Sequence, residues 1–333
     1  MRRRQKPFWQ GTSKSQRKWQ LILLAPPIIT FVVLMLYINN NSFNATDCSC
    51  SESLKIKENN IKKLSAFLVV LIMTGPNFVE NRQVIRETWL SISSDDVLPR
   101  FVIGTANLPD DQVMELTAEN EQYHDLLLLK NHEDSYNSLT YKLIKMYEWL
   151  DKNVEYSYVL KADDDTFVQL NLLVDELKNK QREQLYWGYF DGRAHVHKAG
   201  KYAEKDFKLC DRYLPYALGG GYILSKDIVS FVAQNSKQLN VYNAEDVSLG
   251  SWVAAIKVNR IHDVRFDTEY KTRGCNNQYL ITHKQSQDDM RNKHFNLLTT
   301  GKLCETEVQT RLSYVYDWDV LPSLCCKKAE GTP

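Results

Sequence analysis

Apolar runs alternate with amphipathic stretches along most of this 333-residue chain. The first run, Ala66–Met73, is continuous and ends at Thr-Gly-Pro, which is typical of a buried parallel strand. Further strands are predicted at 100–104, 125–129 and 156–161. Helices are predicted between them at 79–90, 110–123 and 136–150. Strands that alternate with helices predict an α/β fold, in which a mostly parallel sheet is covered by helices.

An uncharged stretch, residues 21–38, precedes this pattern. Eighteen helical residues at 1.5 Å each span roughly 27 Å, enough for a thin bilayer. Residues 1–20 contain seven Lys or Arg and no acid, so this end should stay cytosolic and the remainder should be lumenal. A cleaved signal peptide is the alternative, but its apolar core would be shorter and a small-residue cleavage site should follow. We therefore expect a retained type II membrane anchor.

These features divide the chain into five predicted parts. They are a cytosolic tail (1–20), a transmembrane signal-anchor (21–38), a lumenal stem (39–65), one folded domain (66–326) and a C-terminal tail (327–333). The stem is rich in Asn, Ser and Lys, a composition typical of a flexible segment. Asn40 and Asn44 begin glycosylation sequons there, and Asn40, next to the predicted membrane, is the poorer acceptor.

Charge and cysteine content narrow the class of protein. The net charge is +1 and the first 20 residues carry +7, so the rest carries −6, which gives no support for nucleic-acid binding. Most of the seven cysteines should pair in an oxidising lumen, and the odd count leaves one free or bonded to another chain. We expect the adjacent Cys325 and Cys326 to bond to different partners.

Three consecutive acids, Asp163, Asp164 and Asp165, follow the strand predicted at 156–161. Adjacent carboxylates repel one another, so their unpaired burial would be costly. A hard divalent cation that also contacts phosphate oxygens would remove that cost. A solvated acidic turn is the alternative. Because ligands of parallel sheets collect at the carboxyl ends of strands, we favour a metal site.

Two further motifs lie at compatible places. Arg82 and Arg86, spaced i and i+4 on the first predicted helix, share one face and suit phosphate oxygens. A pair of solvated arginines explains them about as well. Gly219, Gly220 and Gly221 precede an apolar run, where glycine allows the backbone to approach a ligand closely. A bulge at the start of a strand is the alternative for the glycines.

Glu245 and Asp246 precede a helix predicted at 247–255. Such acids often only cap a helix, but a carboxylate there can act as a general base towards a bound hydroxyl. His283 follows an apolar run and could be a ligand, although a lone histidine is more often a surface or core residue. Trp187 could stack on a sugar ring or belong to the core.

Four motifs in order, 82–89, 161–167, 216–222 and 245–247, make residues 66–326 resemble the β1,3-galactosyltransferase family, glycosyltransferase family 31. The resemblance implies a single GT-A catalytic domain in the Golgi that uses UDP-galactose and Mn²⁺. Five stretches are most similar to members that extend the galactose of Gal-β1,4-Xyl on proteoglycan core proteins: 209–221, 265–270, 273–280, 283–286 and 312–318. Such members build the linker between glycosaminoglycan and protein.

The resemblance also implies roles for residues. An α-linked donor and a β-linked product require inversion in one displacement, with one base and a stabilised leaving group. The implied base is Asp246, with Glu245 and Trp187 on the acceptor side. The implied metal ligands are Asp165, Asp163 and His283, and the implied donor-binding residues are Arg82, Arg86, Asp163, Asp164 and Gly219–Gly221. A sibling enzyme using UDP-N-acetylglucosamine or a glycolipid acceptor is one alternative. A non-catalytic lumenal sugar-binding protein is another, but it should have lost some of these acids.

The topology gives a first testable prediction. Protease added to sealed vesicles that contain the protein should spare everything beyond about residue 40, because the basic flank keeps only the N-terminus outside the lumen. Immunoblotting against the C-terminal domain measures the protection. Detergent should abolish it, and digestion of that domain in intact vesicles would contradict the topology.

Overall fold

The computed structural model describes residues 63–200 and 203–328. The predicted tail, the membrane anchor, nearly all of the stem, both sequons (Asn40 and Asn44) and the last five residues lie outside the described residues. The described part belongs to one compact unit that extends over Ile61–Pro333. Among the helices in that part, none is both long and apolar enough to span a bilayer.

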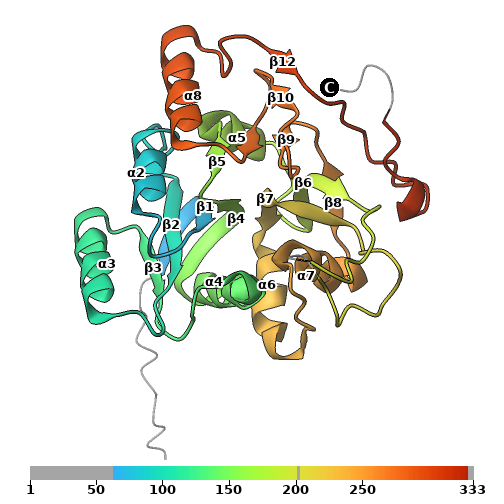
Figure 1. Cartoon of the computed structure of the whole chain (residues 1–333), viewed down its shortest axis with the longest axis horizontal. Helices are drawn as coiled ribbons and strands as arrows, with labels where there is room; N and C mark the ends of the chain where they lie inside the picture. The colour runs from blue at the N-terminus through green and yellow to red at the C-terminus, as the bar shows by residue number, and fades with distance from the viewer. Residues whose placement is uncertain (1–62, 201–202, 329–333) are drawn as a thin grey trace, which may run out of the picture. The chain divides into compact units, whose positions relative to one another are not determined.

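A seven-stranded sheet with the order β3-β2-β1-β4-β7-β6-β8 forms the centre of this unit (Figure 1). Its strands are β1 (Leu64–Met73), β2 (Val97–Gly104), β3 (Leu126–Leu129), β4 (Val154–Asp163), β6 (Leu185–Asp191), β7 (Tyr216–Ser225) and β8 (Asn259–His262). Strands β3, β2, β1 and β4 are parallel, β7 is antiparallel to both of its neighbours, and β6 is parallel to β8. The predicted α/β fold with a mostly parallel sheet is therefore confirmed.

Helices cover the sheet on both sides, with α4, α6 and α7 on one side and α2, α5 and α8 on the other (Figure 1). The α-helices are α2 (Val79–Glu87), α3 (Asp110–Tyr123), α4 (Leu139–Asn153), α5 (Leu170–Leu177), α6 (Lys226–Asn235), α7 (Glu245–Trp252) and α8 (Gln287–Thr300). Single 3₁₀ turns are η1 (Tyr136–Ser138), η2 (Ser236–Gln238), η3 (Val253–Ala255) and η4 (Pro322–Leu324). Because both faces are covered, the last six residues of β1 are all buried, as the continuous apolar run predicts.

A second, three-stranded sheet, which was not predicted, brings His283 next to the three aspartates. It consists of β5 (Thr166–Val168), β11 (Ile281–His283) and β9 (Phe266–Asp267). Strand β5 begins just after the three aspartates, and β11 pairs with it in antiparallel register, so that His283 lies opposite Thr166. A two-stranded ribbon, β10 (Gly274–Cys275) with β12 (Val308–Gln309), completes the strands.

The cysteine pairing corrects one expectation. Cys325 and Cys326 bond to each other rather than to different partners. Cys275 bonds to Cys304, and Cys210 is free and exposed. Cys48 and Cys50 lie outside the described residues.

A fully buried ion pair holds the region around the second sheet together. Arg273 Nε donates to Asp267 Oδ1 at 3.0 Å, and both side chains are inaccessible to solvent. Arg273 Nη2 also donates to the carbonyls of Val264 and Phe266, at 2.7 and 2.8 Å. Glu269 Oε2 lies 3.5 Å from Arg273 Nε, so two carboxylates and backbone acceptors match the buried guanidinium and offset its desolvation.

This pair generates a stability prediction. Asp267→Asn should remove the carboxylate closest to the buried Arg273, leave only Glu269 at 3.5 Å, and destabilise the fold by about 3 kcal/mol. Asp175→Asn is the matched control, because Asp175 pairs with Lys178 on the surface and should be nearly neutral. Thermal unfolding of the purified variants measures the difference. Equal midpoints for the two variants would show that the buried pair does not stabilise the fold.

Candidate active site

The three aspartates lie where strands β1 and β4 end side by side. Met73 pairs with Asp163 across these parallel strands. Thr74, the residue that directly follows β1, donates a hydrogen bond from its hydroxyl to Asp164 Oδ2 at 2.6 Å. The acidic cluster is therefore at the carboxyl edge of the sheet, where open α/β sheets bind ligands.

Asp163, Asp165 and His283 form a group that could hold a metal ion, with one ligand atom from each lying within 4.8 Å of the others. His283 Nε2 is 3.0 Å from Asp165 Oδ1 and 3.5 Å from Asp163 Oδ2. Two carboxylates and one imidazole suit Mn²⁺ and similar divalent ions. The residues present therefore fit a divalent metal ion.

Gly220 allows this convergence. A Cβ at position 220 would lie 2.5 Å from His283 Cγ, so a side chain there would push the imidazole away. The Gly220 carbonyl in turn accepts a hydrogen bond from Thr166 Oγ1 at 2.7 Å. The backbone of β7 thus packs directly against the metal-binding group. The approach of these glycines to a donor stays a prediction.

The acids of the cluster differ in the direction in which their pKa values are shifted. Burial raises the pKa of Asp164 to about 6, against the opposing hydrogen bond from Thr74. Burial also raises the pKa of Asp163, because desolvation outweighs the attraction of Lys161. Burial disfavours ionisation of Asp165 as well, but the hydrogen bond and charge of His283 outweigh it and lower that pKa. Asp165 is therefore the most firmly ionised acid of the three.

Lys161 connects this group to the second pair of acids, and the sequence analysis did not single it out. Its ammonium group is buried and donates to Asp163 Oδ1 at 2.6 Å, Glu245 Oε1 at 2.9 Å and the Gly219 carbonyl at 2.5 Å. Burial alone would lower the pKa of Lys161, but the charges of Asp163 and Glu245 raise it. The available signal was a lysine that directly follows the apolar residues 158–160, two residues before the acids.

Asp246 lies at the first turn of α7 and is partly exposed. Its Oδ2 accepts from the Gly219 amide at 2.9 Å, and its Oδ1 from the Val247 amide at 2.8 Å. Burial, and next the charge of Glu245, raise the pKa of Asp246 to about 8. For the buried Glu245, desolvation is outweighed by the charge of Lys161 and the pKa is lowered. The two neighbouring carboxylates thus differ in charge state: one stays ionised and the other can exchange a proton near neutral pH.

Arg82 and Arg86 do not reach this site with free donors, which corrects the sequence prediction. Arg82 is fully buried and binds Glu119 of α3 through two nitrogens, at 2.8 and 2.6 Å. Its third contact is the carbonyl of Gly75, at 2.7 Å. Arg86 binds Glu119 and Asp125. Their charges are already neutralised, so we assign both arginines to the structure of the α2–α3 region.

Trp187 is also corrected, because it is fully buried and cannot stack on a sugar. Its Nε1 donates to Asp263 at 3.0 Å, and its ring packs edge-on against Phe266 at 5.1 Å between centroids. Trp187 is therefore part of the core beneath the second sheet.

Residues 80–264 match the Galactosyltransferase family, and this range is more than half of the chain and includes both groups of acids. The chain belongs to the galactosyltransferase family. The resemblance to β1,3-galactosyltransferases is thereby confirmed, and the protein is an enzyme of the galactosyl-transfer class. Membership implies a nucleotide-sugar donor and a glycoconjugate acceptor.

Two curated relatives show the range of the similarity. The galactosyltransferase is 49% identical over 278 residues to Beta-1,3-galactosyltransferase 6 of Mus musculus, a match covering 81% of this chain and 86% of the mouse protein. It is 31% identical over 242 residues to Hydroxyproline O-galactosyltransferase GALT2 of Arabidopsis thaliana, covering 70% of this chain. The second match spans only 35% of the plant protein.

Solved structures are more distant. A crystal structure of an active-site mutant of LgtC is 12% identical with a TM-score of 0.37, covering 65% of this chain and 86% of that one. A mannosyltransferase, PcManGT from Pyrobaculum calidifontis, determined with GDP-Man and Mn²⁺, has a TM-score of 0.36 and 11% identity, covering 59% and 54%. Similarity at this level carries no argument about the site.

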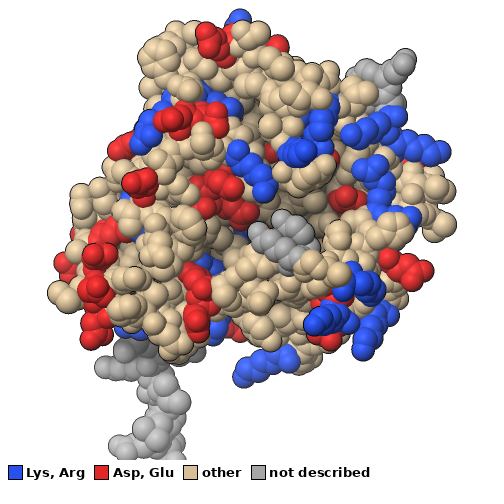
Figure 2. Space-filling model, viewed as in Figure 1, with Lys and Arg blue, Asp and Glu red and all other residues tan. Residues whose placement is uncertain are grey.

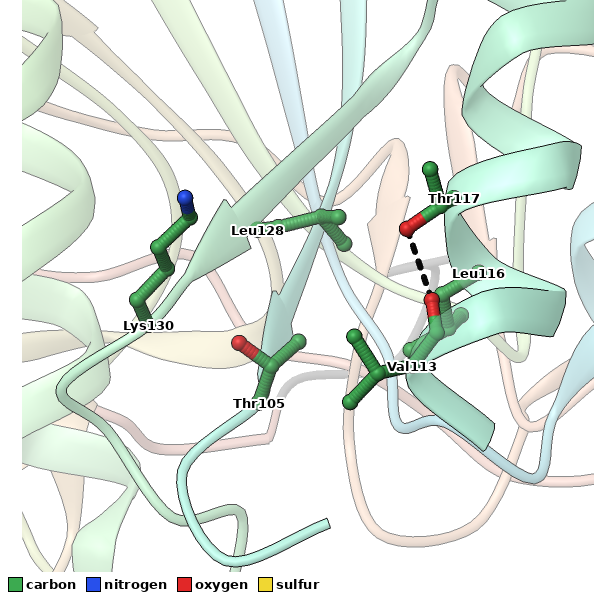
Figure 3. A pocket seen from close by; sticks show the side chains of 6 residues that line it. All are labelled: Thr105, Val113, Leu116, Thr117, Leu128 and Lys130. Atoms are coloured by element: carbon green, nitrogen blue, oxygen red, sulfur yellow. Dashed lines mark hydrogen bonds between the residues drawn. The ribbon is translucent and has the colours of Figure 1, made fainter. Parts of the chain in front are cut away.

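A separate cavity of about 350 Å³ lies between α3 and the ends of β2 and β3 (Figure 3). It is lined by Thr105, Val113, Leu116, Thr117, Leu128 and Lys130. These lining residues include no carboxylate or imidazole, so they offer a metal ion no side-chain ligand of the kind found at the acidic site.

The metal-binding group generates a binding prediction. Asp165→Asn should weaken Mn²⁺ binding by at least about tenfold, because even groups that only support a ligand contribute that much. Titration of Mn²⁺, followed by the paramagnetic resonance of the free ion, measures the change. Asp175→Asn on the surface is the control. Unchanged binding in the Asp165 variant would exclude this carboxylate as a ligand.

Proposed function

We propose that this galactosyltransferase is an inverting, Mn²⁺-dependent enzyme that uses UDP-galactose. The acceptor is the 3-hydroxyl of galactose in Gal-β1,4-Xyl-β-O-Ser, so the product extends the linker between glycosaminoglycan and proteoglycan core protein. We further propose that it is a single-pass type II protein of the Golgi membrane with a lumenal catalytic domain. The observation that carries the mechanism is the divergence of the pKa values of Glu245 and Asp246 beside a metal-binding group.

Inversion needs a base that removes the acceptor proton from the side opposite the leaving group. Asp246 has the required properties: a raised pKa, partial exposure and two backbone amides that orient its carboxylate. Glu245 is the weaker candidate, because its buried carboxylate is bound to Lys161 and stays ionised. Neighbouring carboxylates with divergent pKa values are a general sign of separate acid and base roles.

On the donor side, Asp163, Asp165 and His283 would hold the metal ion. A divalent ion bound there supplies positive charge that stabilises the departing diphosphate. Lys161 binds both Asp163 of the metal-binding group and Glu245, the residue before the proposed base. These two ion pairs hold the metal-binding group and the base in fixed positions relative to each other. Asp164 is held by side-chain hydrogen bonds from Thr74 and Asn81 and is the third acid proposed to contact the donor.

A panel of donors and acceptors tests the substrate assignment. UDP-galactose, UDP-N-acetylgalactosamine and UDP-N-acetylglucosamine are each combined with Gal-β1,4-Xyl-β-aglycone, a glycolipid and a β-linked N-acetylglucosamine acceptor. The proposal requires the highest kcat/KM for UDP-galactose with Gal-β1,4-Xyl. A higher value for another pair would assign the enzyme to a sibling specificity.

The base assignment yields a kinetic prediction. Asp246→Asn is nearly isosteric but cannot accept the proton, so kcat should fall by about 10²–10⁴-fold. Binding of UDP with Mn²⁺ should barely change in this variant, whereas Asp165→Asn should weaken it. If Asp246→Asn retains near-normal kcat, Glu245 becomes the candidate base.

The pH dependence follows from the same residue. A base works only when ionised, so the wild-type kcat/KM should rise with pH as Asp246, whose pKa is about 8, loses its proton. Activity should therefore be lost as pH falls. A full pH–rate profile measures this rise, and the residual activity of Asp246→Asn should lack it. An identical profile in both proteins would argue against Asp246.

A further inference from the structure

The long loop between β6 and β7, residues 192–215, packs against the helix that carries Asp246. The contact is an apolar cluster separate from the main core, which includes Phe207, Tyr213, Tyr242 and Val247. The Phe207 ring lies 5.0 Å from the Tyr242 ring and 5.1 Å from the Tyr213 ring, between centroids. Val247 directly follows Asp246, so the loop rests on the first turn of α7.

A buried carboxylate attaches the loop a second time. Glu204 is only 4% exposed, and its side chain accepts hydrogen bonds from the backbone amides of Asn243 and Asp206. Its own amide donates to the carbonyl of His197 at 2.7 Å. Asn243 lies just before the Glu245–Asp246 pair, so the loop is held in a constant position relative to the base. A buried carboxylate without such partners would be costly.

The outer side of this loop is basic. Residues 192–212 contain six Lys or Arg and three acids, one of which is the buried Glu204. Arg193 and Arg212 are half-buried and donate to the carbonyls of Cys326 and Arg193, and Lys201 lies outside the described residues. The exposed acids of this stretch are Asp206 and Asp211. Lys198, Lys205 and Lys208 are exposed, and in the described part of the chain no carboxylate forms an ion pair with any of them. Figure 2 shows Lys and Arg gathered along the right-hand side of the molecule and acids mainly on the left. This basic surface stands out because the chain beyond residue 20 has a net charge of −6.

We propose that this basic loop surface, defined by Lys198, Lys205 and Lys208, binds acidic residues next to the glycosylated serine of the acceptor polypeptide. The inference rests on the proposed function. Gal-β1,4-Xyl carries no charge, so the cations of this loop, which packs against the helix that carries Asp246, have no partner in the sugar. Ionised carboxylates of the polypeptide are complementary to them. Exposed charges of this kind raise the rate of encounter and select partners, and salt weakens them.

Two glycopeptides test the inference. Both carry Gal-β1,4-Xyl-β-O-Ser, and they differ only in flanking glutamates in one and glutamines in the other. For the wild type, kcat/KM should be about tenfold higher on the glutamate peptide at low salt. The ratio of kcat/KM on the glutamate peptide to kcat/KM on the glutamine peptide should approach one as the salt concentration rises. This part of the test uses the wild-type enzyme alone.

A charge-removal variant, Lys198→Ser with Lys205→Ser and Lys208→Ser, should bring the ratio close to one. The matched control, Lys130→Ser with Lys152→Ser and Lys237→Ser, removes the same charge from exposed lysines elsewhere and should keep the wild-type ratio. The ratio does not depend on how much of each variant is folded, because a loss of folded enzyme lowers the rates on both peptides equally.

The outcomes separate the two proposals. Turnover of both peptides with a wild-type ratio of one, or a ratio unchanged in the loop variant, would overturn the docking surface alone. No turnover of either peptide would overturn the proposed acceptor and this inference with it. An unchanged ratio together with weakened binding of the loop variant to phosphatidylserine vesicles would assign the lysines to a membrane surface instead.

Discussion

The buried ammonium group of Lys161 is the interaction on which the site depends. A cation in the middle of a sheet is expensive unless its partners compensate it. Here two carboxylates from different parts of the chain, Asp163 and Glu245, do so, together with the Gly219 carbonyl. Without this charge the acids would repel one another across a shared space. Lys161 therefore allows the dense negative charge of the candidate metal site to exist next to the proposed catalytic base.

Strand β7 contributes to the same site because its glycines have no side chains. A Cβ at Gly219 would lie 2.5 Å from Glu245 Oε1, and a Cβ at Gly220 would contact His283. The antiparallel β7 runs beside β4, so its glycines lie at the level of the acids that end β4. Backbone thus replaces side chain where the two groups of acids come closest, and the space saved is occupied by Glu245 and His283.

Much of the fold could be predicted from the sequence because its strands are long or continuously apolar. Helix 110–123 has the predicted bounds. The strand expected at 156–161 is observed as Val154–Asp163, two residues longer at each end. The second sheet could not be predicted, because strands of two or three residues have no measurable periodicity.

The site was predictable only in part, for a similar reason. The motifs located the acids and His283, since these lie in distinctive local sequences. The partners of charged groups are long-range: Arg86 is neutralised by Glu119 and Asp125, which its own helix does not reveal. Trp187 is likewise a core residue because it is fully buried, and the burial of a tryptophan cannot be read from its residue type alone.

The antiparallel pairing of β5 with β11 has a consequence for the order of events during synthesis. Asp163 and Asp165 emerge from the ribosome in the middle of the chain, but His283 follows only near the end of the domain. The β5–β11 pairing closes a long loop, and such non-local contacts form slowly. A nascent chain therefore carries an incomplete set of metal ligands until almost the whole domain has been made. Metal capture is coupled by topology to the completion of the polypeptide.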